Sequence, residues 1–141
     1  MNIYNILRAG ALCLTLLTSA LAQAQVKVVY HINEGLAQAY RAMGNIRNHL
    51  AADPTVKITV VTHGPGIDFL LDGATNAIGE SFAGSIGDLA SKGVEFKVCN
   101  NTLVTRKIPK DRVVMEASVV PSGVSEVALL QAKSGFVYLR P

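Results

Sequence analysis

The sequence predicts a single three-layer α/β domain in which a mostly parallel five-stranded sheet carries helices on both faces. The chain has 141 residues, enough for one domain and too few for two. Half of the residues are apolar and 16% are charged, a composition typical of chains that fold around a core. Segments with strand and helix patterns alternate four times, and parallel neighbouring strands require such crossover connections.

Five short runs rich in β-branched or aromatic residues are predicted to form the strands. These runs are residues 26–32, 56–62, 94–98, 117–120 and 136–139. Each is short enough to cross a small sheet once.

Between the strands, apolar residues recur every three or four positions, which predicts amphipathic helices. The apolar stripes are Leu36, Tyr40, Met43, Ile46 and Leu50 in the first gap, Phe82, Ile86 and Leu89 in the second, and Val124, Val127 and Leu130 in the last. Residues 101–107 have room for about two helical turns before Pro109 ends the helix. The glycine-rich residues 64–79 are expected to form a loop around a short helical turn.

The first 24 residues have the pattern of a secretory signal peptide. Arg8 precedes an uncharged, mostly apolar run at 9–22, and the segment Ala-Gln-Ala at 22–24 supplies the small residues that signal peptidase reads. The apolar run is shorter than the roughly 20 residues of a membrane span. We therefore expect residues 25–141 to be released as a periplasmic domain without stable membrane insertion, with an uncleaved anchor as the alternative.

Removal of the signal peptide also removes Cys13 and leaves Cys99 as the remaining cysteine. A lone thiol in an exported protein is buried and inert, pairs with another chain, or stays free because its reactivity is used. The cysteine count leaves these three readings open.

Residues with chemical potential gather after the predicted strands, where open α/β sheets bind ligands. They are His31, Asn33 and Gly35 after the first strand, His63, Gly64 and Gly66 after the second, Cys99, Asn100, Asn101 and Thr102 after the third, and Pro121, Ser122 and Gly123 after the fourth. We expect one thiol, two imidazoles and several small polar groups at one edge of the sheet.

Cys99 is expected where the third strand meets a short helix, a position that favours a thiolate. The free N–H groups and the positive dipole end of a helix stabilise an anion and lower a cysteine pKa. Asn100 or Asn101 would cap that helix. His31 and His63 would position a substrate or transfer a proton, and a buried structural Cys99 remains the alternative.

Several other functions are disfavoured. A net charge of +3, the absence of Trp and 6% aromatic residues argue against nucleic-acid binding. Residues 63–69 begin like a dinucleotide loop but lack its third glycine, and no Walker loop or G-x-S-x-G elbow occurs, so no cofactor is expected. His31, His63 and Cys99 are chemically suitable zinc ligands, yet without short-range ligand spacing no metal is expected.

Three segments of the chain together resemble the DsrE/DsrF-like family. They are residues 98–103 (VCNNTL), residues 119–124 (VVPSGV) with 135–141 (GFVYLRP), and residues 28–32 (VVYHI). The resemblance covers nearly all of residues 25–141. It implies a flavodoxin-like topology, assembly as a trimer or hexamer, and a cysteine at position 99 that carries sulfur as a persulfide.

The resemblance makes a periplasmic sulfur carrier or sulfurtransferase-like protein the leading functional prediction. The carrier would exchange sulfur with a donor or with an acceptor thiol protein. Because the predicted signal peptide directs export, sulfur relay to transfer RNA is not expected. Two alternatives remain: a non-enzymatic oligomeric module that binds a small ligand or partner with Cys99 merely packed, and a redox sensor that forms an intermolecular disulfide.

Overall fold

The computed structural model describes residues 24–141. The predicted signal peptide, with Cys13, lies outside the described residues except for Ala24. Within the described part of the chain, no helix has both the length and the apolar character needed to cross a membrane.

One five-stranded sheet forms the centre of the molecule, in the order β4-β3-β2-β1-β5, and all its neighbouring strands pair in parallel. The strands are β1 (Lys27–Ile32), β2 (Lys57–Thr62), β3 (Glu95–Cys99), β4 (Ala117–Val120) and β5 (Val137–Leu139). The predicted fold class is confirmed, and each strand lies within a residue or so of its expected bounds. The flavodoxin-like topology is wrong, because that order is 2-1-3-4-5 whereas here the chain steps outward from β1 to β4 before β5 returns to the free side of β1.

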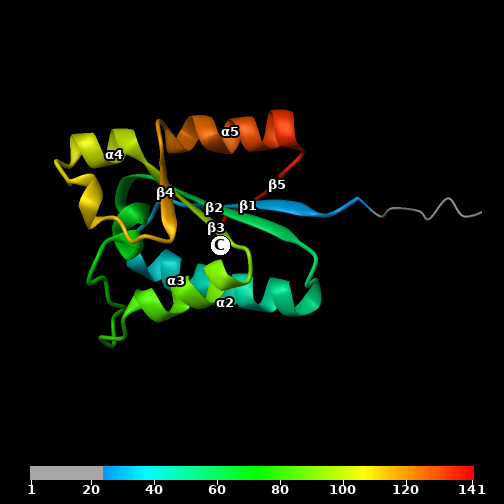
Figure 1. Cartoon of the computed structure of the whole chain (residues 1–141), viewed down its shortest axis with the longest axis horizontal. Helices are drawn as coiled ribbons and strands as arrows, with labels where there is room; N and C mark the ends of the chain where they lie inside the picture. Colours follow the sequence, from blue (N-terminus) through cyan, green and yellow to red (C-terminus); the bar gives the residue numbers. More distant parts are fainter. Residues whose placement is uncertain (1–23) are drawn as a thin grey trace, which may run out of the picture.

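Helices cover both faces of the sheet (Figure 1). Helices α2 (Leu36–Ala52) and α3 (Phe82–Ser91) lie on one face, and α5 (Gly123–Ser134) lies on the other. The short helix α4 (Asn100–Thr105) follows β3 directly, and the 3-10 turns η2 (Gly64–Leu70) and η3 (Lys110–Arg112) complete the described elements. The crossover connections between parallel strands are right-handed. The connection from β4 to β5 runs across the sheet in the opposite direction to the earlier connections, so its helix α5 lies on the opposite face.

Local sequence determines where the longer helices begin. Ser81 and Ser122 are the N-caps of α3 and α5. Their side-chain oxygens accept hydrogen bonds from backbone N–H groups in the first turn of each helix. At the start of α2, Gln38 reaches back, and its Oε1 accepts from the N–H groups of Asn33 and Glu34, each at 2.8 Å. These contacts hold the loop between β1 and α2 against the sheet edge.

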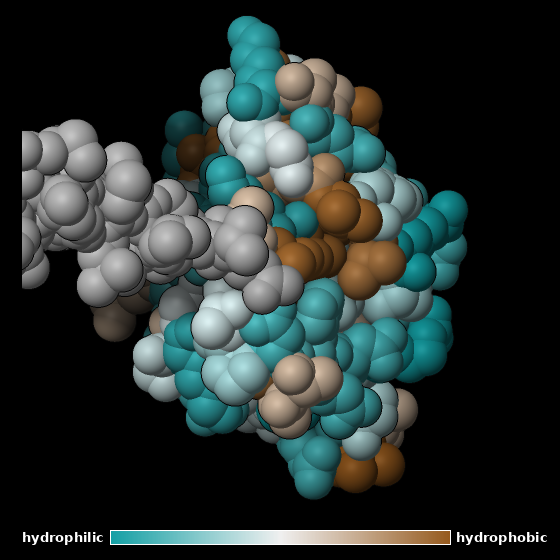
Figure 2. Space-filling model, turned by 90° about the vertical axis from the view of Figure 1, so that its right-hand side faces the viewer, coloured by the Kyte–Doolittle hydropathy of each residue, from teal (hydrophilic) through white to brown (hydrophobic). Residues whose placement is uncertain are grey.

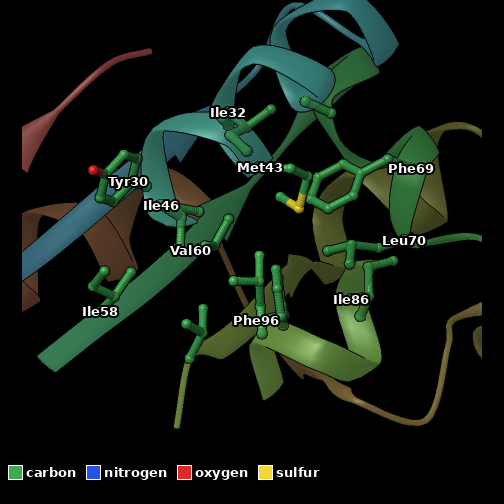
Figure 3. Packing of buried hydrophobic residues seen from close by; sticks show 14 of the residues in the cluster. Tyr30, Ile32, Met43, Ile46, Ile58, Val60, Phe69, Leu70, Ile86 and Phe96 are labelled. Atoms are coloured by element: carbon green, nitrogen blue, oxygen red, sulfur yellow. The ribbon is translucent and has the colours of Figure 1, made fainter. Parts of the chain in front are cut away.

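The main core lies between the sheet and the α2, α3 and η2 elements (Figure 3). Met43 of α2, Phe69 of η2 and Phe96 of β3 are nearly inaccessible there, and the rings of Phe69 and Phe96 meet edge to face with centroids 6.3 Å apart. A smaller cluster on the opposite face joins β1 and β2 to α5. The sheet is therefore buried on both sides, as expected for parallel strands.

Two residues of the predicted apolar stripe of α2 lie outside the core. Leu36 is partly exposed and Tyr40 is 57% exposed, whereas Met43 and Ile46 are buried as predicted. The small residues Ala39 and Ala42 take the inward positions, because they allow the helix to approach the sheet closely. Leu36 and Tyr40 instead line an apolar groove of about 620 Å³ with residues 75–78. On α5, Val127 and Leu130 are buried as predicted, but Val124 is 63% exposed.

The first part of the glycine-rich segment is packed structure. Residues 64–70 form η2, and Ile67, Phe69 and Leu70 are buried in the main core. The short helical turn expected there is present, but it forms part of the core wall.

Candidate functional site

Strand alternation brings Cys99, His31 and His63 to one face of the sheet. Side chains two residues apart on a strand share a face. Val29 and Val61 pack with α5, so His31 and His63, two residues further along, lie on the same side. The pairing of β2 with β3 ends at Thr62 beside Val98, which makes His63 the next neighbour of Cys99.

Cys99 is the last residue of β3 and the N-cap of α4. The helix begins one residue earlier than expected, so the cap is Cys99 itself and neither Asn100 nor Asn101, whose predicted capping role is wrong. At an N-cap the side chain lies beside the free N–H groups of the first helical turn. A sulfur atom thus occupies the place where a serine oxygen commonly accepts hydrogen bonds.

The backbone N–H groups of Gly123, Thr102 and Asn101 and the Thr102 hydroxyl lie around the Cys99 sulfur and favour its thiolate form, although the side chain makes no capping hydrogen bond to α4. Burial of the thiol opposes its ionisation and raises its pKa, but these donors outweigh burial, so the pKa of Cys99 lies below its ordinary value. The donors come from the first turns of two helices, α4 and α5, whose positive dipole ends meet at the sulfur. The thiolate form is therefore stabilised by fixed groups.

Two packing features hold these donors in place. Thr102 Oγ1 accepts a hydrogen bond from Gly64 N–H at 2.9 Å, which leaves the hydroxyl proton free to point at sulfur. Gly123 sits so close to the strand ends that a Cβ built on it would lie 3.2 Å from the Cβ atoms of both Cys99 and His63. The start of α5 therefore reaches the sulfur only because residue 123 has no side chain.

The two histidines are neighbours, with ring centroids 4.8 Å apart. His31 Nδ1 is also 2.8 Å from the hydroxyl of Tyr138 on β5. The pKa of His31 is lowered by burial and by the nearby His63 and Arg140, and burial lowers the pKa of His63. Burial therefore favours the neutral form of both rings.

These lowered pKa values predict that the fold loses stability in mild acid. Below the ordinary histidine pKa of about 6.5, the two histidines bind protons more readily in the unfolded chain than in the folded chain. The free energy of unfolding therefore decreases as the pH is lowered. Urea unfolding should show a lower midpoint at pH 5.5 than at pH 7.5. The His31→Gln/His63→Gln double variant should lose most of that difference, and a double variant with the full wild-type difference would contradict this assignment.

Three further predicted site residues, Asn33, Asn100 and Ser122, do not act on the Cys99 sulfur. The side-chain oxygens of Asn33 and Asn100 are buried without a hydrogen-bond partner. Ser122 caps α5 by accepting from Ser125 N–H and is not among the groups that lower the pKa of Cys99.

Gln38 and Tyr138 also belong to this region and were not among the residues predicted from the sequence. Gln38 is a buried polar residue that anchors the loop after β1, and Tyr138 contacts His31 from 107 positions away. Within residues 24–141, no three His, Cys, Asp or Glu side chains converge closely enough to hold a metal ion.

Solved structures with a similar fold include the following two. A protein of unknown function from Methanobacterium thermoautotrophicum, MTH1491, is 29% identical with a TM-score of 0.73, and the match covers 83% of this chain and all of that one. The crystal structure of the E. coli ychN protein matches with a TM-score of 0.68 over the same shares of the two chains, and its 13% identity shows the fold alone. No curated protein matches the chain.

The family comparison covers nearly the whole sequence. The model of the DsrE/DsrF-like family matches residues 10–139, which include all the strands together with Cys99, His31 and His63. The chain belongs to the DsrE/DsrF-like family.

Proposed function

We propose that this protein is a periplasmic sulfur carrier that holds sulfane sulfur as a persulfide on Cys99. Membership of the DsrE/DsrF-like family indicates a role of the sulfur-relay type. The observation that carries the finer proposal is the set of donors around the Cys99 sulfur, which lowers the pKa of the thiol. Such donors serve an anion, whereas a cysteine that only packs needs none.

The chemistry needs no external oxidant. The Cys99 thiolate attacks the terminal sulfur of a donor R–S–SH, a bond forms between Cys99 Sγ and that sulfur, and the S–S bond of the donor breaks. The leaving R–S⁻ keeps the electron pair and takes up the proton that Cys99 released, so the products are Cys99–S–SH and R–SH. An acceptor thiolate then attacks the outer sulfur and restores the Cys99 thiolate.

The burial of Cys99 restricts what can react with it. The residue is only 4% exposed, so a donor has to present a terminal sulfur atom on a slender group. The same burial favours the second candidate function, a binding module in which Cys99 is structural. Reactivity of the thiol separates the two.

We also propose export to the periplasm, supported by the sequence of the first 24 residues, and assembly into a homo-oligomer. Strand β5 has β1 as its single neighbour, and its three residues are exposed and apolar or aromatic. They offer apolar surface at an unpaired strand edge, and Val124 and Leu129 are further exposed apolar residues on α5. Figure 2 shows hydrophobic side chains gathered near the middle of one face, with hydrophilic ones around them.

The test is the mass of the protein after exposure to a low dose of polysulfide or thiosulfate. The chain has two cysteines, so the Cys13→Ser variant isolates Cys99 and the Cys99→Ser variant isolates Cys13. We expect Cys13→Ser to gain one sulfur atom rapidly, reversibly with reductant, and Cys99→Ser to gain at least tenfold less in the same time. Native mass spectra of the same samples report the number of chains in each oligomer.

Failure of the Cys13→Ser variant to gain sulfur, together with resistance of Cys99 to alkylation, would establish a structural cysteine. The binding-module reading would then replace the carrier. A Cys99-linked dimer in the absence of reductant would instead support the redox-sensor alternative.

A further inference from the structure

All buried side-chain polar atoms that lack a hydrogen-bond partner within residues 24–141 lie at the sheet edge that holds Cys99. They are His31 Nε2, Asn33 Oδ1 and Asn100 Oδ1, which follow or end strands β1 and β3. A buried polar atom without a partner costs free energy, and such atoms are rare in folded proteins. Their gathering beside a thiol indicates a place for a polar ligand.

Tyr138 forms a hydrogen bond with one ring nitrogen of His31 and leaves the other nitrogen without a partner. The Tyr138 hydroxyl and His31 Nδ1 are 2.8 Å apart, and which of the two donates depends on the tautomer of the ring. In the tautomer in which the Tyr138 hydroxyl donates to Nδ1, the ring proton resides on Nε2, the nitrogen without a partner. In that tautomer His31 presents a buried, unused hydrogen-bond donor.

The charged groups around this donor are paired. Arg140 is close enough to His31 to lower its pKa, and burial lowers the pKa of the nearest ring, His63. The acidic residue of this loop, Glu34, is paired with Arg140, and Glu126 of α5 is paired with Lys97. Neither carboxylate is left to repel an incoming anion.

We propose that His31 Nε2–H, with its tautomer set by Tyr138, binds the anionic group of a small sulfur donor while the sulfane sulfur of that donor meets Cys99. The proposal rests on the carrier function and names the substrate class: compact inorganic or organic anions with a terminal sulfur, such as thiosulfate or polysulfide. His63 lies between His31 and Cys99 in the order of strands, and its ring centroid is 4.8 Å from that of His31. His31 and Tyr138 are positioning residues, whereas Cys99 makes the bond.

The test compares alkylation of Cys99 by anionic iodoacetate and by neutral iodoacetamide, in the Cys13→Ser background. The two reagents report the same thiolate, so the ratio of their rates isolates the preference for an anion. His31→Ala should lower the iodoacetate-to-iodoacetamide ratio about tenfold, the effect of losing one hydrogen bond to a charged group. Tyr138→Phe should lower the ratio less, about threefold, because the ring then exchanges between tautomers. His31→Gln, which keeps an N–H donor, should retain most of the ratio.

Tyr138 is exposed, and Tyr138→Phe removes only its hydroxyl group at the edge of the sheet. This variant therefore tests the proposal even where His31→Ala does not fold. His49→Gln, on α2, is the matched control and should keep the wild-type ratio. An unchanged ratio in both His31→Ala and Tyr138→Phe would overturn the proposal while sulfur loading of the wild type still supported the carrier. A lowered ratio in a protein that takes up no sulfur would uphold the anion subsite and reject the carrier.

Discussion

Replacing Gly66 with alanine should destabilise the protein by about 3 kcal/mol or more, measured as the free energy of unfolding in urea. A Cβ on Gly66 would lie 2.1 Å from the carbonyl oxygen of Ile32 and 2.4 Å from its carbonyl carbon. Both atoms belong to the backbone at the end of β1, so no side-chain rotation relieves the clash. Either η2 moves away from the sheet or β1 loses its last pairing with β2.

The cost at Gly66 is steric and not conformational, because Gly66 is not among the residues with positive φ. Gly44→Ala is the matched control: nothing lies within 4 Å of a Cβ at that position in the middle of α2. Since glycine weakens a helix interior, Gly44→Ala should stabilise the protein by roughly 0.5–1 kcal/mol. Equal stabilities of Gly66→Ala and the wild type would show that η2 is not clamped against β1 as described.

Much of the fold could be predicted because each strand is a short β-branched run and each helix has an apolar repeat. Strand β3 shows this plainly, with Phe96 and Val98 buried on one side of the strand. The order of the strands could not be obtained in this way. The sequence of β5 does not say on which side of β1 it pairs, since that depends on which sheet edge α5 can reach.

The helix stripe of α2 shows where periodicity misleads. Tyr40 has the spacing expected of a core residue, but it is exposed. The buried face of α2 contains Ala39 and Ala42 instead, and these small side chains let the helix backbone approach the sheet. Close packing of small residues therefore determines the buried face. Large apolar residues alone do not reveal it.

The residues of the site that directly follow or end a strand could be predicted from the local sequence. Cys99, His31 and His63 each follow a strand, and parallel strands bring their carboxyl ends to one edge. The hydrogen bond between Tyr138 and His31 was not predictable, because it depends on β5 pairing with β1. The role of Thr102 was only partly visible, since its tie to Gly64 joins segments 38 positions apart.

Gly123→Ala should slow the reaction of Cys99 with iodoacetamide about tenfold at pH 7, an effect of the size of one lost hydrogen bond to a charged group. A Cβ at this position would lie 2.9 Å from the carbonyl oxygen of Thr62 and 3.2 Å from the Cβ atoms of Cys99 and His63. The first turn of α5 then has to move back, and the Gly123 N–H moves away from the sulfur. Because that N–H lowers the pKa of Cys99, the pKa of the variant should be higher than that of the wild type.

The pH profile separates this effect from general damage to the helix. The thiolate is the reacting species, so the rates of wild type and Gly123→Ala should differ at neutral pH and converge in alkali, where both thiols are ionised. Ser122→Ala removes the N-cap of the same helix without removing a donor to the sulfur. It should cost about 1 kcal/mol of stability yet keep the wild-type profile of alkylation against pH. If Gly123→Ala also kept that profile, the start of α5 would have no part in stabilising the thiolate, and the N-terminus of α4 alone would account for it.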